Sequence, residues 1–317
     1  MAHRWMCLLP TVVDRGFAMS KKQKASERSA ESVTTTRNMW DVYDFVQPLG
    51  SGTFGVVREV KPKQGKQRFA VKTIPVAADI EMVLMLKLEH EHVARLEHAI
   101  LEAQEMHLIM ELCSGGDLQA WIDDRWDDEF NGTKFYDSPG SGQVATLSRQ
   151  MLSAVAYMHH LSVAHRDIKP SNWLIAARGF FPVFKLSDFG LAVEFQPGER
   201  MTKTCGSFMY MAPEVFNKSY TELCDVWSSG MVIYELVCGK PFFTNIPEGE
   251  MEAAVCKAGT CEVKLEEREW NHQRPWLKTW LQQMLVKESG RPAASMALNH
   301  PEIQRAKWTG KCQCNVS

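Results

Sequence analysis

The chain has 317 residues, of which 45% are hydrophobic, so it is long and apolar enough to form one large domain or two lobes. Its 36 Lys and Arg residues nearly balance its 38 Asp and Glu residues, which gives no electrostatic reason to expect nucleic acid or an anionic membrane as a main partner. The nine cysteines are scattered without CxxC spacing, so we expect no disulfide framework and no zinc site, and a reducing, cytoplasmic location.

The first 40 residues are predicted to form a disordered extension. The segment from Met6 to Val13 is apolar, but Pro10 interrupts it and no small-residue cleavage site follows, so a secretory signal is not expected. After Met19, which is a second candidate start codon, the polar stretch SKKQKASERSAESVTTT shows no helical stripe. No apolar run approaches the ~18 residues of a transmembrane helix.

Short β-type segments characterise the region after residue 43. Apolar residues predict strands over 56–60, 69–71 and 108–110. Between the second and third of these, the segment MVLMLKL directly after Glu81 predicts a helix. Several strands with one helix indicate a small lobe of α+β class.

A helical pattern begins at Val144. Apolar residues recur at steps of three and four from Val144 to Met158, as on one face of an amphipathic helix. Residues 226–238 are apolar nearly all round, which predicts a helix buried at the centre of a domain. Further helices are expected over 276–285 and 293–298. The predicted architecture is therefore a small β-rich lobe followed by a larger helical lobe.

Residues 123–143 stand apart from the helical segments on either side. They are acidic at first and then rich in Gly, Ser and Pro, which indicates an exposed insertion. A solvated loop is the simpler interpretation of this composition, and an acidic docking surface is the alternative.

Three glycines, Gly50, Gly52 and Gly55, lie in the pattern GxGxxGxV. A dinucleotide-binding fold needs a strand before such a pattern and a helix after it, whereas β-type residues follow it here. This favours a strand–turn–strand hairpin over phosphates, where glycine lets backbone amides approach phosphate oxygens. The chain contains no GxxxxGK[ST] pattern, which excludes a P-loop. Fifteen residues past Val57, Lys72 ends an apolar strand.

The segment from His165 to Asn172 reads HRDIKPSN, and a DFG tripeptide follows at 188–190. Asn172 and Asp188 carry the oxygen ligands that a hard divalent cation prefers. Together with the carboxylate of Asp167 and the ammonium of Lys169, they provide a base, a cation and two metal ligands. Phosphoryl transfer from MgATP requires this set of groups.

With these motifs the chain resembles the eukaryotic serine/threonine protein kinases over residues 43–303, followed by a short tail at 304–317. The resemblance implies the two-lobed protein kinase fold, α+β in class. The segments CGSFMYMAPEV, YTELCDVWSSGMVIYELVCGKPFF and ALNHPEI are similar to the calcium/calmodulin-dependent and calcium-dependent branch. No D-x-D-x-[DN]-G loop follows, so no EF-hand region and no direct control by calcium are expected.

The resemblance implies a role for each catalytic residue. Asp167 is expected to orient the acceptor hydroxyl and take its proton, and Lys169 to neutralise charge on the moving phosphoryl group. Asn172 and Asp188 are expected to hold Mg²⁺. Lys169, two residues after the base, is typical of serine/threonine kinases, and Ser207 is expected to bond to both the base and this lysine. Since none of these residues is missing, activity is expected.

The resemblance also implies an ATP site. Lys72 is expected to contact the phosphates and to pair with Glu81. Only nine residues separate the two, about half the usual spacing, so the helix must start late. An ATP-binding scaffold without catalytic activity is therefore the alternative interpretation. The full set of expected nucleotide-binding residues is Leu49, Gly50, Gly52, Gly55, Val57, Ala70, Lys72, Glu81, Met110, Glu111, Cys113, Asp117, Leu174 and Asp188.

Within this set, Met110 to Cys113 is expected to form the hinge beside adenine, with Met110 as gatekeeper, and Asp117 to bind the ribose. The three residues expected to sandwich the purine are Val57, Ala70 and Leu174. The sequence does not distinguish such a sandwich from plain core.

The segment from Asp188 to Glu214 is expected to be the activation segment. In relatives, the arginine at the position of Arg166 often binds a phosphate on this segment. Lys203 stands where many relatives carry the phosphothreonine, with Thr202 and Thr204 on either side. Two interpretations follow: either threonine is phosphorylated, or the activation segment is ordered without a phosphate.

Two scaffold contacts are also implied by the resemblance. Glu214 is expected to pair with Arg291, and Asp225 to brace the catalytic loop. Asp117 and Glu235 are candidates for binding basic substrate residues that precede the target Ser or Thr.

Expected partners are protein substrates with Ser or Thr acceptors, and no nucleic acid. The chain ends CNVS, which fits the C-a-a-X prenylation pattern at Cys314, although Asn315 is not aliphatic. Membrane association is expected only if Cys314 is lipidated.

Overall fold

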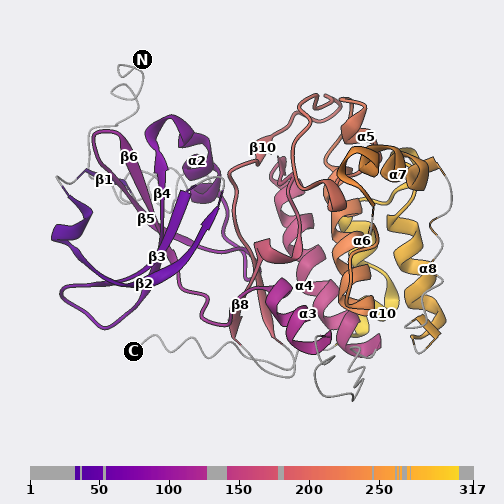
Figure 1. The fold of residues 1–317 in the computed structure, drawn as a ribbon, viewed down its shortest axis with the longest axis horizontal. Coiled ribbons are helices and arrows are strands. Elements are labelled where there is room, and N and C mark those ends of the chain that lie inside the picture. The colour runs from indigo at the N-terminus through magenta and orange to yellow at the C-terminus, as the bar shows by residue number, and fades with distance from the viewer. Residues whose placement is uncertain are drawn as a thin grey trace, which may run out of the picture. The chain divides into compact units, whose positions relative to one another are not determined.

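The computed structural model describes residues 33–35, 38–52, 55–126, 141–177, 182–244, 246–260, 263, 265, 270, 271 and 273–306. The chain falls into two compact units. The smaller unit comprises Met1–Lys87 and Leu96–Glu111, and the larger comprises Leu88–Arg95 and Leu112–Ser317. The first is mainly a β-sheet and the second mainly helical (Figure 1). The predicted α+β class, with a β-rich small lobe and a helical large lobe, is confirmed.

The smaller unit is built around a six-stranded sheet with the order β1-β5-β6-β4-β3-β2. Its strands pair antiparallel except that β1 runs parallel to β5. The elements are β1 (Val33–Thr35), η1 (Met39–Asp41), β2 (Tyr43–Gly52), β3 (Gly55–Pro62), β4 (Phe69–Pro75), η2 (Val76–Ala78), α2 (Asp79–Lys87), β5 (Leu96–Leu101) and β6 (Glu105–Glu111).

The two faces of this sheet carry different side chains, because successive residues of a strand point to opposite faces. One face forms a buried apolar cluster of Met39, Tyr43, Val60, Val71, Ile100 and Ile109. Residues that alternate with members of this cluster along β3, β4 and β6, among them Val57, Lys72 and Met110, project to the opposite face. That second face therefore carries several of the predicted nucleotide-binding residues, namely Val57, Ala70, Lys72 and Met110.

The structure places order inside the first 40 residues, which were expected to be disordered. Val33–Thr35 form β1, which pairs with the outer edge of β5. Asn38 caps η1 by accepting the N–H of Trp40 at 2.9 Å, and Met39 is fully buried in the apolar cluster. The physical reason is that β5 offers an open edge for strand pairing and the cluster accepts an apolar side chain. Residues 1–32 lie outside the described part.

The described part of the larger unit contains the remaining helices, two two-stranded sheets and three isolated β-bridges. Its elements are α3 (Leu118–Trp126), α4 (Ser141–His160), β7 (Val163–Ala164), η4 (Pro170–Asn172), β8 (Trp173–Ala177), β9 (Val183–Leu186), β10 (Val193–Glu194), η5 (Phe208–Tyr210), α5 (Pro213–Phe216), α6 (Leu223–Cys238), α7 (Glu248–Thr260), α8 (Pro275–Met284), η7 (Glu288–Gly290), α9 (Ala294–Leu298) and α10 (Pro301–Arg305). The four helices predicted for this lobe are all present, as α4, α6, α8 and α9.

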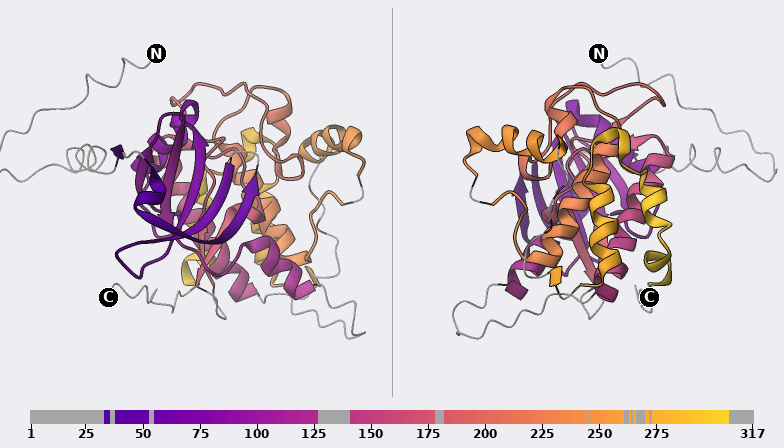
Figure 2. Two further views of the ribbon diagram at one scale, coloured as in Figure 1. Left: turned by 60° about the vertical axis from the view of Figure 1, so that its left-hand side comes forward. Right: turned by 90° about the vertical axis from the view of Figure 1, so that its right-hand side faces the viewer.

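Helix α6 forms the centre of the larger unit, as its apolar sequence predicted. Every residue from Cys224 to Cys238 is buried, and α4 packs along it (Figure 2). At Gly230 a Cβ atom would lie 2.8 Å from Leu285, so glycine permits close packing against the residue that follows α8. Gly239 ends the helix with a φ of +70°, a left-handed conformation that glycine adopts without steric cost.

Two predicted segments fall largely outside the described residues. Of the insertion at 123–143, the first residues belong to α3 and Ser141 begins α4, while 127–140 are not described. The tail with its C-a-a-X pattern also lies beyond the described residues, which end at Ala306. Within the described part, none of the helices has the length and apolar character needed to cross a membrane.

Residues 88–95 belong to the larger unit because they join its β9 strand. His92 Nδ1 lies 3.0 Å from the carbonyl oxygen of Phe184, to which it donates, and the N–H of Leu186 bonds to the His92 carbonyl at 2.9 Å. Burial lowers the pKa of His92 from 6.5 to about 4, more than the hydrogen bond to Phe184 raises it. His92 is therefore neutral in the folded protein at pH 7.

We expect His92 to make the protein sensitive to acid. Because the pKa of His92 is lower in the folded state than in the unfolded state, the unfolded chain binds more protons between pH 6.5 and pH 4. Stability is then lost as the pH falls through this window, by about 2 kcal/mol at pH 5. Replacing His92 by Asn keeps a donor for Phe184, and urea unfolding at pH 7.5 and pH 5 should show a loss smaller by that amount.

The control is His160→Asn, an exposed histidine at the end of α4. This variant should lose as much stability between pH 7.5 and pH 5 as the unmodified protein. If His92→Asn lost as much stability between pH 7.5 and pH 5 as the unmodified protein, His92 would not be the source of the acid sensitivity.

Candidate active site

The hairpin of β2 and β3 holds the glycine pattern. Gly50 pairs with Val57 and Gly52 with Gly55 across the hairpin. Gly55 has a φ of +139°, and a Cβ atom there would lie 2.2 Å from the carbonyl oxygen of Thr73. At Gly50, no atom lies within 4 Å of the position that a Cβ would take. The sheet itself therefore requires glycine at 55, whereas the backbone at Gly50 has an open side.

This difference predicts effects of different size on stability when each glycine is replaced by alanine. Gly55→Ala should lower the free energy of unfolding by about 2 kcal/mol, because the backbone must be strained or shifted to admit the methyl group. Gly50→Ala should change it by less than about 0.5 kcal/mol. Urea unfolding of the two variants measures both values, and equal effects would show that the sheet does not distinguish the two positions.

Lys72 and Glu81 form a buried ion pair. Strand β4 ends at Pro75, η2 follows, and α2 begins at Asp79, so Glu81 lies in the first turn of a helix that starts late, as expected. The Nζ atom of Lys72 lies 2.6 Å from Oε1 of Glu81, and both side chains are buried. The short spacing between the two residues therefore does not prevent the pair.

The sheet register aligns the predicted nucleotide residues of the smaller unit. Val57 lies directly opposite Lys72, and Ala70 directly opposite Met110. Since cross-strand partners share a face, these four side chains line the face of the sheet opposite the apolar cluster. Leu49, in β2, is exposed. The structure thus brings a lysine and a set of apolar side chains onto one surface, as a nucleotide with a flat base and charged phosphates requires.

The segment after β6 carries the other predicted nucleotide contacts. Glu111 ends β6, and Cys113 follows it and is partly buried. Asp117 forms an antiparallel bridge with Leu174. The Oδ1 atom of Asp117 accepts the N–H of Ala120 at 2.9 Å, at the start of α3. Asp117 therefore caps a helix, a role that the sequence analysis missed, in addition to the predicted ribose contact.

The catalytic loop assembles Asp167, Lys169 and Ser207 as expected. Lys169 Nζ lies 2.9 Å from Oδ2 of Asp167 and donates to Ser207 Oγ at 3.1 Å. The hydroxyl of Ser207 in turn donates to Oδ1 of Asp167 at 2.8 Å. Asn172 donates its side-chain amide to the carbonyl of Asp167 at 2.8 Å. A carboxylate is thus fixed between a cation, a hydroxyl and an amide.

The DFG tripeptide is held beside this loop. Phe189 is fully buried and packs edge-on against His165, with 5.1 Å between the ring centroids. His165 Nε2 bonds to the carbonyl of Ser187 at 3.0 Å. Among the described residues, four that are not glycine have a positive φ, and Arg166 and Asp188 are two of them. Such strain persists only where the surrounding structure imposes it, and it marks functional sites.

Asn172 and Asp188 fit a magnesium ion. The amide hydrogens of Asn172 face Asp167, which leaves its oxygen as the ligand atom, and Asp188 supplies a carboxylate. Mg²⁺ typically takes one or two carboxylates together with substrate phosphates and water. In the described part, no group of three or more His, Cys, Asp or Glu side chains is placed to hold a metal by itself, so an ion here would take its remaining ligands from phosphates and water.

Asp225 braces the catalytic loop from α6. Its carboxylate accepts the N–H groups of His165 and Arg166, each at 2.8 Å, and bonds to His159 at 2.9 Å. Burial alone would raise the pKa of Asp225, but the hydrogen bond and charge of His159 and these backbone donors lower it. A fully buried carboxylate thus stays ionised and orients the backbone next to Asp167.

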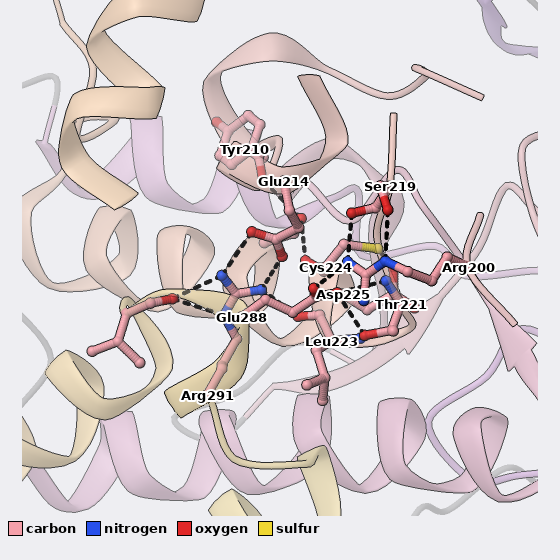
Figure 3. A network of polar contacts seen from close by, with 12 residues as sticks. Arg200, Tyr210, Glu214, Ser219, Thr221, Leu223, Cys224, Asp225, Glu288 and Arg291 are labelled. Carbon is pink, nitrogen blue, oxygen red and sulfur yellow. Dashed lines mark hydrogen bonds and ion pairs between the residues drawn. The ribbon is translucent and has the colours of Figure 1, made fainter. Parts of the chain in front are cut away.

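Glu214 and Arg291 form a second buried pair (Figure 3). Both guanidinium Nη atoms of Arg291 bond to the Glu214 carboxylate. Arg291 also donates to the carbonyls of Leu223 at 2.9 Å and Val286 at 2.8 Å, and lies 5.1 Å from the Trp227 ring centroid. The predicted pair therefore ties α5 to the start of α6 and to the segment after α8.

Glu235 has less capacity to recognise basic substrate residues than its sequence position indicates. It is fully buried, and its carboxylate accepts the hydroxyl of Tyr210 at 2.6 Å and the amide of Gln119 at 3.1 Å. Burial raises the pKa of Glu235. The carboxylate oxygens are thus already engaged inside the larger unit.

The sequence analysis missed one polar network altogether. Arg200 contacts Glu288, 88 residues further along the chain, and also Ser219 (Figure 3). These residues belong to no recognisable motif, and nothing in their local sequence marks them as partners.

Comparisons with known proteins agree with this geometry. Residues 43–303 match the protein kinase domain family. Calcium-dependent protein kinase 9 of Oryza sativa subsp. japonica is 33% identical over 278 residues, covering 84% of this chain and 46% of that protein. Calcium-dependent protein kinase 12 of Arabidopsis thaliana is 36% identical over 238 residues, covering 68% of this chain and 46% of that protein.

Serine/threonine-protein kinase 33 of Mus musculus is 30% identical over 265 residues, covering 77% of this chain and 51% of that protein. The chain thus spans about half the length of the curated relatives it matches. Because the matched family covers most of the sequence, including the glycine pattern, the Lys72–Glu81 pair and the catalytic loop, the chain belongs to the protein kinase family.

Proposed function

We propose that this protein is a serine/threonine protein kinase that transfers the γ-phosphoryl group of MgATP to Ser and Thr hydroxyls of protein substrates. The observation that carries the proposal is the set of contacts between Asp167, Lys169 and Ser207. Lys169 two residues after the base, with a hydroxyl residue bonded to both, is the arrangement typical of serine/threonine kinases. The similarity to serine/threonine-protein kinase 33 of Mus musculus supports the same class.

The proposed chemistry depends on positioning more than on base strength. Asp167 accepts a hydrogen bond from the substrate hydroxyl and later its proton. Ser207 holds the carboxylate of Asp167 in place, and Asn172 holds both its backbone carbonyl and its carboxylate. Lys169 places its ammonium where negative charge grows on the phosphoryl oxygens. Asn172 and Asp188 would hold Mg²⁺, which would neutralise charge on the phosphates.

On the smaller unit, Lys72 is proposed to contact the α- and β-phosphates, held in place by Glu81. Val57 and Ala70, with Leu174 of the larger unit, are proposed to contact the purine, and Met110 is proposed as the gatekeeper. We place the activity in the cytoplasm, where reduced thiols such as Cys205 and Cys256 persist.

The alternative of a silent ATP-binding scaffold depended on the short spacing between Lys72 and Glu81. Because the two side chains form a buried pair at 2.6 Å, that spacing no longer gives a reason for inactivity. The decisive test is phosphate transfer from MgATP to a mixed Ser/Thr peptide library, with a Tyr-only library as the control. Incorporation into the first library alone supports the proposal, and ATP binding without incorporation into either would overturn it.

A further inference from the structure

Three consecutive anchors hold the middle of the activation segment against residues 219–220. The guanidinium of Arg200 donates to the hydroxyl of Ser219 at 2.7 Å and to its carbonyl at 2.5 Å. Met201 and Tyr220 exchange two backbone hydrogen bonds, at 2.8 and 3.1 Å. The buried hydroxyl of Tyr220 donates to the carbonyl of Lys203 at 2.6 Å. This part of the segment is therefore ordered through contacts within the protein.

Glu288, at the start of η7, connects these anchors to helix α6. One of its oxygens accepts from Arg200 at 2.5 Å, and the other accepts the N–H and hydroxyl of Thr221 at 2.6 and 2.8 Å. Thr221 lies two residues before α6, which carries Asp225 in its first turn. Since Asp225 holds the backbone beside Asp167, the Glu288 carboxylate links the activation segment to the element that braces the catalytic loop (Figure 3).

The groups that would recruit or carry a phosphate are engaged in other contacts. The guanidinium of Arg166 donates to the carbonyl of Leu191 at 2.8 Å and lies 3.4 Å from the hydroxyl of Tyr220. The hydroxyl of Thr204 donates to the carbonyl of Val215 at 3.3 Å. In this arrangement, Arg166 and Thr204 therefore already make hydrogen bonds to other groups of the protein.

From these contacts we propose that the Arg200–Glu288 ion pair positions the activation segment in place of a phosphate group, so that the unphosphorylated protein is catalytically competent. The inference rests on the proposed kinase function. Arg200 and Glu288 are positioning residues, since they act through the segment and through α6 and do not touch the reacting groups. The pair has the chemistry of the phosphate–arginine contact, with a carboxylate as the anion and the arginine on the segment itself.

Electrostatics around the pair favour this assignment. The side chain of Glu288 is mostly buried, whereas about half of the Arg200 side chain is exposed. Burial would raise the pKa of Glu288, but its hydrogen bonds with Arg200 and Thr221 and the charge of Arg200 lower it. The anion is thus permanent at neutral pH, as a structural anion must be.

The protein is first treated with a protein phosphatase, and its intact mass confirms that no phosphate remains. Amide hydrogen exchange is then measured in peptides that span residues 196–204 and 217–222, and phosphoryl-transfer kinetics are measured on the same sample. Phosphate-free wild type should keep its activity and the protection of the Met201 and Tyr220 amides. Arg200→Ala should exchange these amides about tenfold faster, the size expected for losing a charge-assisted contact from a half-exposed pair. Its kcat/KM for protein substrate should fall by about the same factor, with KM for ATP unchanged.

Three further variants separate a specific contact from a general loss of stability. Arg200→Lys, which keeps the charge but not the fork to Ser219, should lie between wild type and Arg200→Ala. In a Glu288→Gln background, Arg200→Ala should add little, because the two residues act through one contact. Arg305→Ala removes an exposed arginine paired with Glu302 and should leave both readouts unchanged.

The inference is overturned if the phosphatase abolishes activity and amide protection in the wild type, or if Arg200→Ala stays as protected as the wild type. If the wild type transfers no phosphate to any library, the proposed kinase function fails. The exchange data then still decide whether Arg200 and Glu288 order the segment, so the two failures are distinguishable.

Discussion

Replacing Asp167 by Asn is expected to lower phosphoryl transfer by about a thousandfold, the effect of removing a positioned proton acceptor. Asparagine has nearly the same shape and can still accept from Ser207, so the loop should keep its conformation. What it loses is the negative charge that attracts Lys169 and takes the proton of the substrate hydroxyl. Initial rates with MgATP and the best peptide from the library, together with nucleotide affinity by calorimetry, measure this directly.

The matched control is Asp44→Asn, the same chemical change in an exposed pair with Lys61. It should leave the transfer rate unaltered. If Asp167→Asn retained wild-type kcat while binding ATP normally, Asp167 would not be the base, and the catalytic assignment would be wrong.

Arg291→Ala is expected to have the largest effect on stability, lowering the free energy of unfolding by about 3–5 kcal/mol. The Arg291 side chain is fully buried and serves Glu214 and the carbonyls of Leu223 and Val286. Its removal leaves a buried carboxylate without its cation, and an unpaired buried charge costs far more than a lost surface contact. Urea unfolding followed by tryptophan fluorescence measures the change.

The size of this effect can be checked against a surface pair. Arg305→Ala breaks the contact with Glu302 in α10, where most of the arginine side chain is exposed, and should cost less than about 1 kcal/mol. Arg291→Lys should still destabilise, because a lysine cannot reproduce the two-pronged contact with Glu214. If Arg291→Ala and Arg305→Ala lowered the free energy of unfolding by similar amounts, burial of the Arg291–Glu214 pair would not explain its contribution to stability.

The sequence predicted most of the fold because its patterns reflect local physical requirements. The apolar character of residues 226–238 led to α6, whose residues are almost all buried. Helix α4 follows from periodicity, although it begins at Ser141, three residues before the first apolar residue of the pattern. By contrast, β1 was missed because three polar or β-branched residues become a strand only when the edge of β5 is there to pair with them.

In the candidate site, too, some features were predicted from the sequence and others depend on the fold. Asp167, Lys169 and Asn172 became candidates because phosphoryl transfer requires a base, a cation and a metal ligand, and Ser207 because of the resemblance to serine/threonine kinases. The structure brings these four residues into contact. The helix-capping role of Asp117 was not predicted, because it depends on where α3 begins.

By itself, the sequence determined the protein kinase family, the order of the two lobes and the candidate catalytic residues, since these are carried by short motifs whose chemistry is local. The tertiary structure alone decided that Lys72 reaches Glu81 despite their short separation, because that depends on where α2 begins. It also decided that Arg200 meets Glu288 and that Arg166 is engaged by Leu191. Contacts between residues far apart in the chain follow from packing around α6, and packing is a property of the whole fold that no local pattern encodes.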